Sequence, residues 1–313
     1  MKFAKQTLMT GAILAVLALP ARADLITFDP TGTPGAGGNL SNVALFDWVP
    51  GSALAVNANS STGLNGSFTT YFQANLGTVQ AADTSSLFTN GGGGNFFTAV
   101  AGFGETVTSC NNVGGFCTNA TFGFDSSNTT NFFDIFKVPG TADNLTGGGF
   151  TGTAILSGQV IGSGFSSNFA LSDTNPSNLD QSPNGNQWPG VSTVSGTGAS
   201  DITIRITFAD PNYFPDLTAG SLITFSAFNT SQILPFKQVD PSRCMSNGLT
   251  DCAITSNVGM FNGAPGSGPD ILFQADANQS FTRATVPEPG TLALLGLGML
   301  MVSGFVGKRQ KRQ

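Results

Sequence analysis

The sequence predicts an all-β fold, an antiparallel β-sandwich or jelly-roll-like domain flanked by an N-terminal signal peptide and a C-terminal transmembrane helix. Three observations predict this class. Between residues 24 and 285, short runs of alternating apolar and polar residues are separated by clusters of Gly, Asn, Ser and Pro. No long stretch of this body has a helical periodicity. The 27 phenylalanines supply a sizeable core, since each ring buries ~150–200 Å².

The alternation is clearest in residues 201–210, where Thr203 and Thr207 share the polar face. The expected apolar face carries Ile202, Ile204, Ile206 and Phe208. In residues 221–229 the expected apolar face carries Ile223, Phe225 and Ala227. Four further strands are expected in 66–77, 95–108, 130–138 and 153–162. This spacing favours two packed antiparallel sheets. We expect loops at Gly91–Gly94 and across 171–200, the longest loop-like region.

Residues 1–23 have the order of parts found in a signal peptide. Lys2 and Lys5 form a positive n-region, and Thr7 to Leu19 form an apolar h-region. Ala21-Arg22-Ala23 then places small residues at the two positions that a signal peptidase reads. We therefore expect export, with Asp24 as the first residue of the mature chain.

Residues 286–313 differ from the rest of the chain. Pro287, Glu288 and Pro289 precede an uncharged segment, 291–307, which as a helix would cover ~25 Å and span a thin hydrocarbon core. The two prolines prevent a helix from entering this segment from upstream. A basic tail, 308–313, follows, and by the positive-inside rule it stays in the cytoplasm. Its charges are those of Lys308, Arg309, Lys311 and Arg312.

Charge and composition exclude several classes of function. The chain has no histidine, so histidine-based triads and histidine zinc sites are ruled out. Residues 24–285 hold five basic and seventeen acidic side chains, a net charge of about −12. Such a surface repels phosphate backbones, so we expect no nucleic acid partner. No pair of carboxyl groups is marked out for general acid and base roles, and we expect no enzyme and no catalytic residue.

The four cysteines form two local pairs in the sequence, Cys110 with Cys117 and Cys244 with Cys252. An exported chain reaches an oxidising compartment, so disulfides are expected. Three connectivities are possible, of which the two local bonds are the most economical. A metal site is the alternative reading, although the spacings are wide and no other soft ligand is near.

Two tryptophans and one acidic cluster are further candidates for binding. Trp48 and Trp188 lie beside Pro-Gly turn residues, where a ring could stack on a sugar or fill a corner of the sandwich. Asp276, Asn278 and Ser280 imitate the start of a calcium loop. However, Phe281 stands where that loop needs Gly, and no Glu closes it. Apart from calcium, the sequence suggests no cofactor or metal.

The C-terminal segment closely resembles the PEP-CTERM family of sorting domains, found on exported proteins of Gram-negative bacteria that make exopolysaccharide. The match covers Val-Pro-Glu-Pro at 286–289, the apolar stretch and Lys-Arg-Gln-Lys-Arg at 308–312. In that family an integral-membrane cysteine transpeptidase, exosortase, recognises the motif and removes the tail. The resemblance implies that Pro287, Glu288 and Pro289 are a recognition site. It also implies a transient inner-membrane anchor before release to the cell surface or extracellular matrix.

The body resembles the flocculation-associated group of PEP-CTERM proteins. The stretches that carry this resemblance lie at 46–55, 71–77, 103–107, 131–136, 145–158, 232–242 and 273–281. The group implies an extracellular matrix protein that helps cells to aggregate within exopolysaccharide, and it implies no catalytic residues. The paired cysteines are a departure from it. The alternative function is that of a secreted carbohydrate-binding or carbohydrate-cleaving β-sandwich that uses Trp48 or Trp188.

Overall fold

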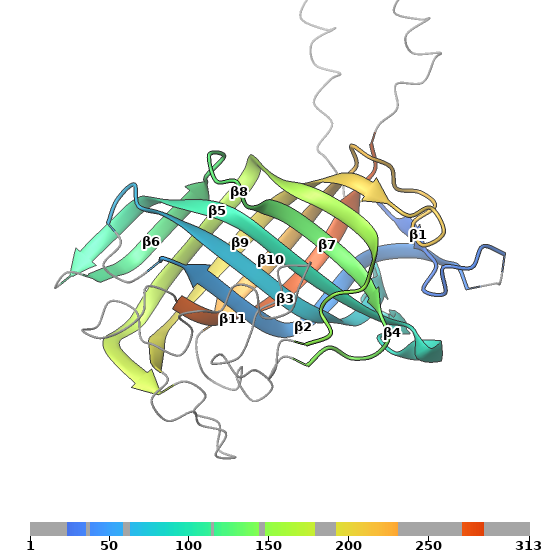
Figure 1. Cartoon of the computed structure of the whole chain (residues 1–313), viewed down its shortest axis with the longest axis horizontal. Coiled ribbons are helices and arrows are strands. Elements are labelled where there is room, and N and C mark those ends of the chain that lie inside the picture. Colours follow the sequence, from blue (N-terminus) through green and yellow to red (C-terminus); the bar gives the residue numbers. More distant parts are fainter. Residues whose placement is uncertain are drawn as a thin grey trace, which may run out of the picture. The chain divides into compact units, whose positions relative to one another are not determined.

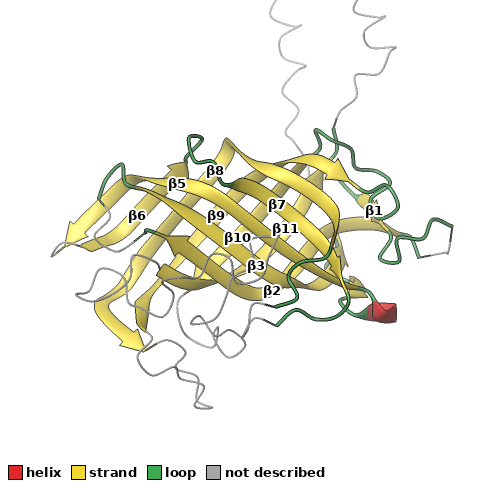
Figure 2. Ribbon diagram, in the orientation of Figure 1, coloured by secondary structure: helices red, strands yellow, loops and turns green. Residues whose placement is uncertain are grey.

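The computed structural model describes residues 24–35, 38–58, 63–113, 116–143, 148–178, 192–230 and 271–284. Strands dominate these residues, with one short 3₁₀ turn at Gly92–Gly94 (Figure 2). In chain order the strands are β1 (Ile26–Phe28), β2 (Leu40–Val56), β3 (Ser67–Ala81), β4 (Ser86–Thr89), β5 (Phe96–Val113), β6 (Phe116–Phe124), β7 (Asn131–Val138), β8 (Thr153–Asn178), β9 (Ser192–Ala209), β10 (Leu222–Thr230) and β11 (Ile271–Thr282). The all-β prediction is confirmed for this part of the chain.

These strands belong to one antiparallel sheet that closes on itself (Figure 1). Going around the sheet, the neighbours are β2, β11, β10, β9, β8, β6 together with β7, then β5 and β3. The circuit closes because β3 also pairs with β2, for example Ala53 opposite Phe72. The expected arrangement of two packed sheets is therefore wrong, and a single sheet surrounds one interior. Closure pairs the sheet's edges with each other and removes the need for a second sheet.

Strands β6 and β7 share one position in this circuit, lying end to end between β5 and β8. The first half of β5, Phe96 to Phe103, pairs with β7, and its second half, from Glu105 onward, pairs with β6. Strand β8 does the same from the other side. The turn between β6 and β7 is tied to β5 because Asp125 donates its backbone N–H to the carbonyl of Gly104 at 3.0 Å. Because β6 and β7 together pair with the whole length of β5, both halves of β5 are part of the closed sheet.

One end of the interior is filled by aromatic side chains. Phe28 lies with its ring centroid 4.9 Å from that of Phe46 and 5.4 Å from that of Phe97. Phe214 reaches into the same cluster from the β9–β10 connection, 5.2 Å from Phe28. That connection is fastened to β1, since Thr27 donates its N–H to the Asp216 carboxylate at 2.7 Å. Burial of these large rings closes this end of the sheet with a dense core.

Pro50 and Gly51 form a bulge inside β2 and do not form the turn that the sequence suggested. Trp48 pairs with Leu76 and Ser52 with Gln73, so β2 has one residue more than β3 over this stretch. A Cβ atom at Gly51 would lie only 2.1 Å from the carbonyl oxygen of Gln73. Glycine is needed for this close approach, and the bulge accommodates a proline that cannot donate to the ladder.

The six strands expected from alternation are all present. Ile202, Ile204 and Ile206 are buried, as are all three inward residues expected in β10. Phe208 is the exception, being 47% exposed. Gly158 pairs with Ile206 but Ser157 pairs with Phe208, so an extra residue in β9 ends the alternation before Phe208.

The prediction of a long loop was wrong at both of its ends. Strand β8 continues to Asn178 and β9 begins at Ser192. The polar composition of these strand ends concealed them, since neither end carries the apolar alternation of a half-buried strand. The loop expected at Gly91–Gly94 is confirmed, as a 3₁₀ turn between β4 and β5.

The signal peptide and the C-terminal apolar segment lie outside the described residues, and their expected structures stay predictions. The chain divides into two compact units, Met1–Arg283 and Ala284–Gln313, and the strands belong to the first. In the part of the chain that the structure describes, no helix is long and apolar enough to cross a membrane.

Candidate functional site

A cavity of about 120 Å³ lies within the closed sheet, away from the aromatic cluster. Its wall is built from inward residues of the strands around the circuit, because every second side chain of a strand points inward. Small side chains create the space: Ala53, Ala55, Ala101, Ala120, Ala227 and Ala275 all line it. Large rings complete the wall, namely Phe68, Phe72, Phe103, Phe122, Phe133, Phe169, Phe225 and Phe273.

Glu105 is the one carboxyl group among the described residues that line this cavity. It lies on β5 between the inward residues Phe103 and Val107, and only 4% of its surface is exposed. The preceding residue must be small, since a Cβ atom at Gly104 would come within 2.3 Å of the Cβ of Asn128. The β6–β7 turn therefore packs directly behind the strand segment that presents Glu105.

Burial in apolar surroundings raises the pKa of Glu105 to about 7, because desolvation disfavours the charged carboxylate. Two hydroxyl groups, those of Thr70 and Ser167, act in the opposite direction. Thr70 donates to Oε2 of Glu105 from the neighbouring strand β3. Ser167 in turn shares a 2.9 Å hydrogen bond with Ser200. The polar part of the cavity thus consists of one carboxyl group, the hydroxyl groups of Thr70, Ser167 and Ser200, and the amide of Asn168.

The second oxygen of Glu105, Oε1, is buried and has no hydrogen-bond partner among the described residues. A buried oxygen without a donor is unfavourable, by about 1–3 kcal/mol for a neutral group and more for a charged one. Buried polar groups in folded proteins are nearly always paired, so an unpaired carboxyl oxygen beside a cavity calls for a physical explanation. The arrangement offers one unpaired carboxyl oxygen in a pocket that is otherwise mostly apolar.

Sequence reasoning did not select Glu105, although a signal was present. Its neighbours at 103 and 107 are apolar, and strand alternation gives all three the same face. An ionisable residue in the middle of an apolar stripe is the pattern expected of a buried carboxyl group. Thr70 and Ser167 could not be linked to it from sequence, because they lie on other strands.

Trp48 is not a platform for sugar stacking. Its side chain has 0% exposure and packs in the aromatic end of the interior, 6.1 Å from Phe46 between ring centroids. Its indole N–H donates to Oε1 of Gln279 at 3.1 Å. The Pro-Gly sequence beside it indicated a loop, but the bulge in β2 keeps Trp48 within the strand and turned inward. Trp188, the other candidate, lies outside the described residues.

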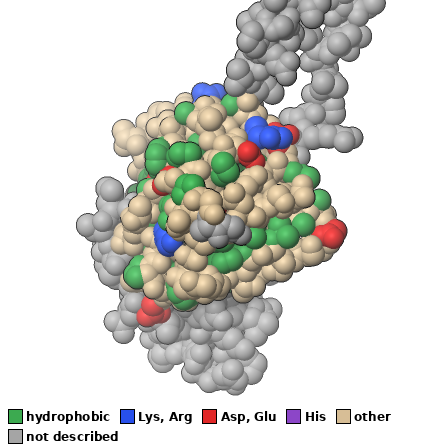
Figure 3. Space-filling model, turned by 90° about the vertical axis from the view of Figure 1, so that its right-hand side faces the viewer, with side chains coloured by type: hydrophobic (Ala, Val, Ile, Leu, Met, Phe, Trp, Pro, Cys, Tyr) green, Lys and Arg blue, Asp and Glu red, His purple; other side chains and the backbone are tan. Residues whose placement is uncertain are grey.

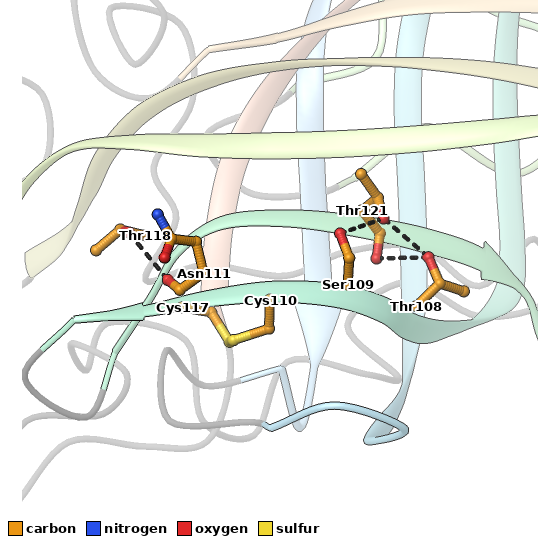
Figure 4. Close-up of a disulfide and its surroundings, with 7 residues drawn as sticks. All are labelled: Thr108, Ser109, Cys110, Asn111, Cys117, Thr118 and Thr121. Atoms are coloured by element: carbon orange, nitrogen blue, oxygen red, sulfur yellow. Dashed lines mark hydrogen bonds between the residues drawn. A yellow bond between two sulfur atoms is a disulfide. The ribbon is translucent and has the colours of Figure 1, made fainter.

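The local cysteine pairing is confirmed for Cys110 and Cys117, which form a disulfide with their Cα atoms 5.3 Å apart (Figure 4). It joins the ends of β5 and β6 near the hairpin tip. Further along the same hairpin, side-chain hydroxyl groups join β5 to β6: Thr121 is hydrogen-bonded to Thr108 at 2.9 Å and to Ser109 at 2.7 Å. Cys117 also lines the cavity. Cys244 and Cys252 lie outside the described residues.

The suggested calcium loop is instead part of strand β11, which the sequence did not predict. Asp276 and Asn278 are exposed, while Ala277 and Gln279 between and beside them are buried. These polar residues therefore project from the outer face at strand spacing and do not converge as loop ligands would. The pKa of Asp276 is raised by partial burial and by the nearby charge of Asp47.

The sorting candidates Pro287, Glu288 and Pro289, and the basic tail Lys308, Arg309, Lys311 and Arg312, lie outside the described residues. Comparison with known families addresses them directly. Residues 285–311 match the family model of the PEP-CTERM protein-sorting motif. No curated protein and no solved structure matches the chain.

This match covers the Pro-Glu-Pro motif, the apolar stretch and most of the basic tail, the three parts on which the sequence resemblance depended. Such a motif is the recognition signal of exosortase, and it indicates an exported protein that is held at the membrane before processing. The chain is therefore a PEP-CTERM sorting domain-containing protein.

Proposed function

We propose that this protein is a non-enzymatic component of the extracellular matrix, sorted by exosortase, that associates with exopolysaccharide and promotes cell aggregation. The sorting motif at 285–311 is the observation that carries the proposal. In this account Pro287, Glu288 and Pro289 are read by the processing enzyme, and the closed β domain is the part delivered to the cell surface of a Gram-negative bacterium.

The outer face of the sheet supports an association with glycans. Much of the surface in Figure 3 belongs to uncharged polar side chains and backbone, with only scattered charges. Pairs of hydroxyl groups lie across neighbouring strands, such as Ser67 and Thr106 at 2.9 Å, while Ser226 donates to Asp201 at 2.6 Å. Hydroxyl, amide and carboxylate groups are the partners that sugar hydroxyls need. The acidic body, at about −12, also suits calcium bridges to anionic polymer.

A carbohydrate-cleaving function is the alternative, and the cavity favours it less. Glycoside hydrolysis requires two carboxyl groups facing each other across the scissile bond. Within the described residues that line the cavity, Glu105 alone is a carboxyl group. A carbohydrate-binding function based on stacking loses Trp48, which is buried, and would depend on Trp188.

Aggregation of three strains of the producing bacterium tests the proposal. One strain lacks the protein, one produces it without residues 286–313, and one carries Pro287→Ala, Glu288→Ala and Pro289→Ala together. We expect flocs to be lost in all three, with the altered proteins still folded. A sugar-binding or sugar-cleaving protein would instead keep its activity after the truncation. Flocs that persist in the deletion strain would contradict the proposal that this is a matrix protein.

A further inference from the structure

We propose that the interior cavity binds a compact, mainly apolar molecule whose single hydroxyl group donates a hydrogen bond to Oε1 of Glu105. The space, the composition of the wall and the unpaired oxygen each support this assignment. It is a separate binding function from the glycan association of the outer face, and neither depends on the other.

The cavity has the size of a small ligand. At about 120 Å³ it is comparable to an engineered apolar cavity of ~150 Å³ in another protein that binds benzene. The alanines that hollow it share the wall with phenylalanines from several strands, so an apolar body would contact aromatic rings on more than one side. Filling such a space recovers dispersion contacts that the wall otherwise lacks.

The hydrogen-bonding capacity of the wall restricts the polar part of the ligand. Oε2 of Glu105 accepts from Thr70, while Oε1 is buried and has no hydrogen-bond partner among the described residues, so Oε1 is the carboxyl oxygen left for a ligand. One hydroxyl group supplies one donor and satisfies this oxygen. An ammonium group brings three donors and a full charge, so most of its N–H groups would be buried unpaired. A monosaccharide would bury several hydroxyl groups against phenylalanine.

Water is the competing occupant beside Glu105. A buried water needs two to four polar partners, and the hydroxyl groups near Glu105 already have partners among the described residues, Thr70 with Oε2 of Glu105 and Ser167 with Ser200. Apart from Asn168, the other described residues of the wall are apolar, so water cannot fill the rest of the cavity favourably. A molecule with one hydroxyl group and an apolar body satisfies both parts of the site at once.

Benzyl alcohol and toluene form a matched pair of probes, since they differ by one hydroxyl group. We would titrate each into the purified secreted protein by calorimetry at pH 8, where Glu105 is mostly ionised. A hydrogen bond to a charged group favours benzyl alcohol by about tenfold to a hundredfold in Kd. In Glu105→Leu that preference should disappear, and in Glu105→Gln, which keeps an acceptor oxygen, part of it should remain.

Asp134→Asn is the matched control, because Asp134 is a carboxyl group on the outer face of β7, bonded to Ser157 at 2.5 Å. It should leave both affinities unchanged, and thermal melting would confirm that each variant is folded. The proposal is overturned if neither probe binds at millimolar concentration, if the two bind equally, or if Glu105→Leu keeps the preference. Tighter binding of benzylamine than of benzyl alcohol would also overturn the hydroxyl assignment.

Discussion

Thr70 on β3 donates a hydrogen bond to the buried carboxyl group of Glu105 on β5, inside an interior that is otherwise mostly apolar. The two strands are direct neighbours, with Thr70 opposite Phe103 and Phe68 opposite Glu105. Thr70 is therefore the diagonal neighbour of Glu105 on the inner face. Because burial raises the pKa of this carboxyl group, the stability of the domain depends on the protonation of one side chain.

Stability should fall as the pH rises through the range in which Glu105 titrates. The pKa of this group is about 7 in the folded protein, against an ordinary value of 4.5. Between these values the folded state holds a proton that the unfolded state has lost, so the free energy of unfolding decreases with pH. The total loss is at most ~3 kcal/mol and is complete above pH ~8. Urea unfolding of wild type and Glu105→Gln from pH 4 to 9 measures it.

Glu105→Gln removes the titrating proton but keeps the shape of the side chain. The difference in unfolding free energy between wild type and variant should therefore change across pH 4.5–7. A difference that stays constant across this range would show that Glu105 titrates normally.

Thr70→Val should destabilise the protein more at pH 8 than at pH 5. The substitution keeps the volume but removes the hydroxyl group that stabilises the charged carboxylate, at a cost of ~1–3 kcal/mol when Glu105 is ionised. The pKa of Glu105 should rise further for the same reason. Thr106→Val is the control, because Thr106 lies on the outer face of β5 and bonds to Ser67. Equal effects of the two variants at both pH values would contradict the assigned role.

Trp48→Phe should destabilise the domain by ~1–3 kcal/mol beyond the loss of ring volume, because it leaves the buried Oε1 of Gln279 without its indole donor. Adding Gln279→Leu removes the unpaired group, so the double variant should recover part of this loss. A double-mutant cycle in urea measures the coupling. Additive effects of the two substitutions would mean that this hydrogen bond contributes nothing to stability.

Loss of the Cys110–Cys117 disulfide should lower the free energy of unfolding by ~2–3 kcal/mol, the loop-closure entropy of a short ring. The double variant Cys110→Ser and Cys117→Ser, compared with the oxidised protein, gives this value. Because the bond holds the tip of the β5–β6 hairpin beside the cavity, binding of benzyl alcohol should weaken as well. Unchanged stability would indicate that the hairpin is held by its strand pairing alone.

The sequence was informative where one strand carries its own signal. Alternation predicted β9 from Ile202, Ile204 and Ile206, which are buried. It predicted β10 in the same way, from Ile223, Phe225 and Ala227. Strand β11 was missed because the centre of its inner face, between Phe273 and Phe281, consists of the weakly hydrophobic Ala275, Ala277 and Gln279. Closure of the sheet could not be predicted either, because alternation shows which face of a strand points inward but not which strand lies beside it.

The cavity depends on contacts that no local pattern encodes. Glu105 and Thr70 are 35 residues apart, and Ser167 comes from β8. The sequence could identify an ionisable residue in an apolar stripe, but not the alanines on other strands that leave it beside empty space. The sorting motif needed no tertiary contact, because all of its parts are contiguous in residues 285–311.

Intact mass and C-terminal peptide mapping of the secreted protein test the central claim most directly. Sorting by exosortase predicts mature material that begins at Asp24 and lacks the apolar segment 291–307 and the basic tail 308–313. The same protein from a strain without exosortase should keep the tail and remain with the membrane fraction. Secreted protein that still ends at Gln313 would contradict the account.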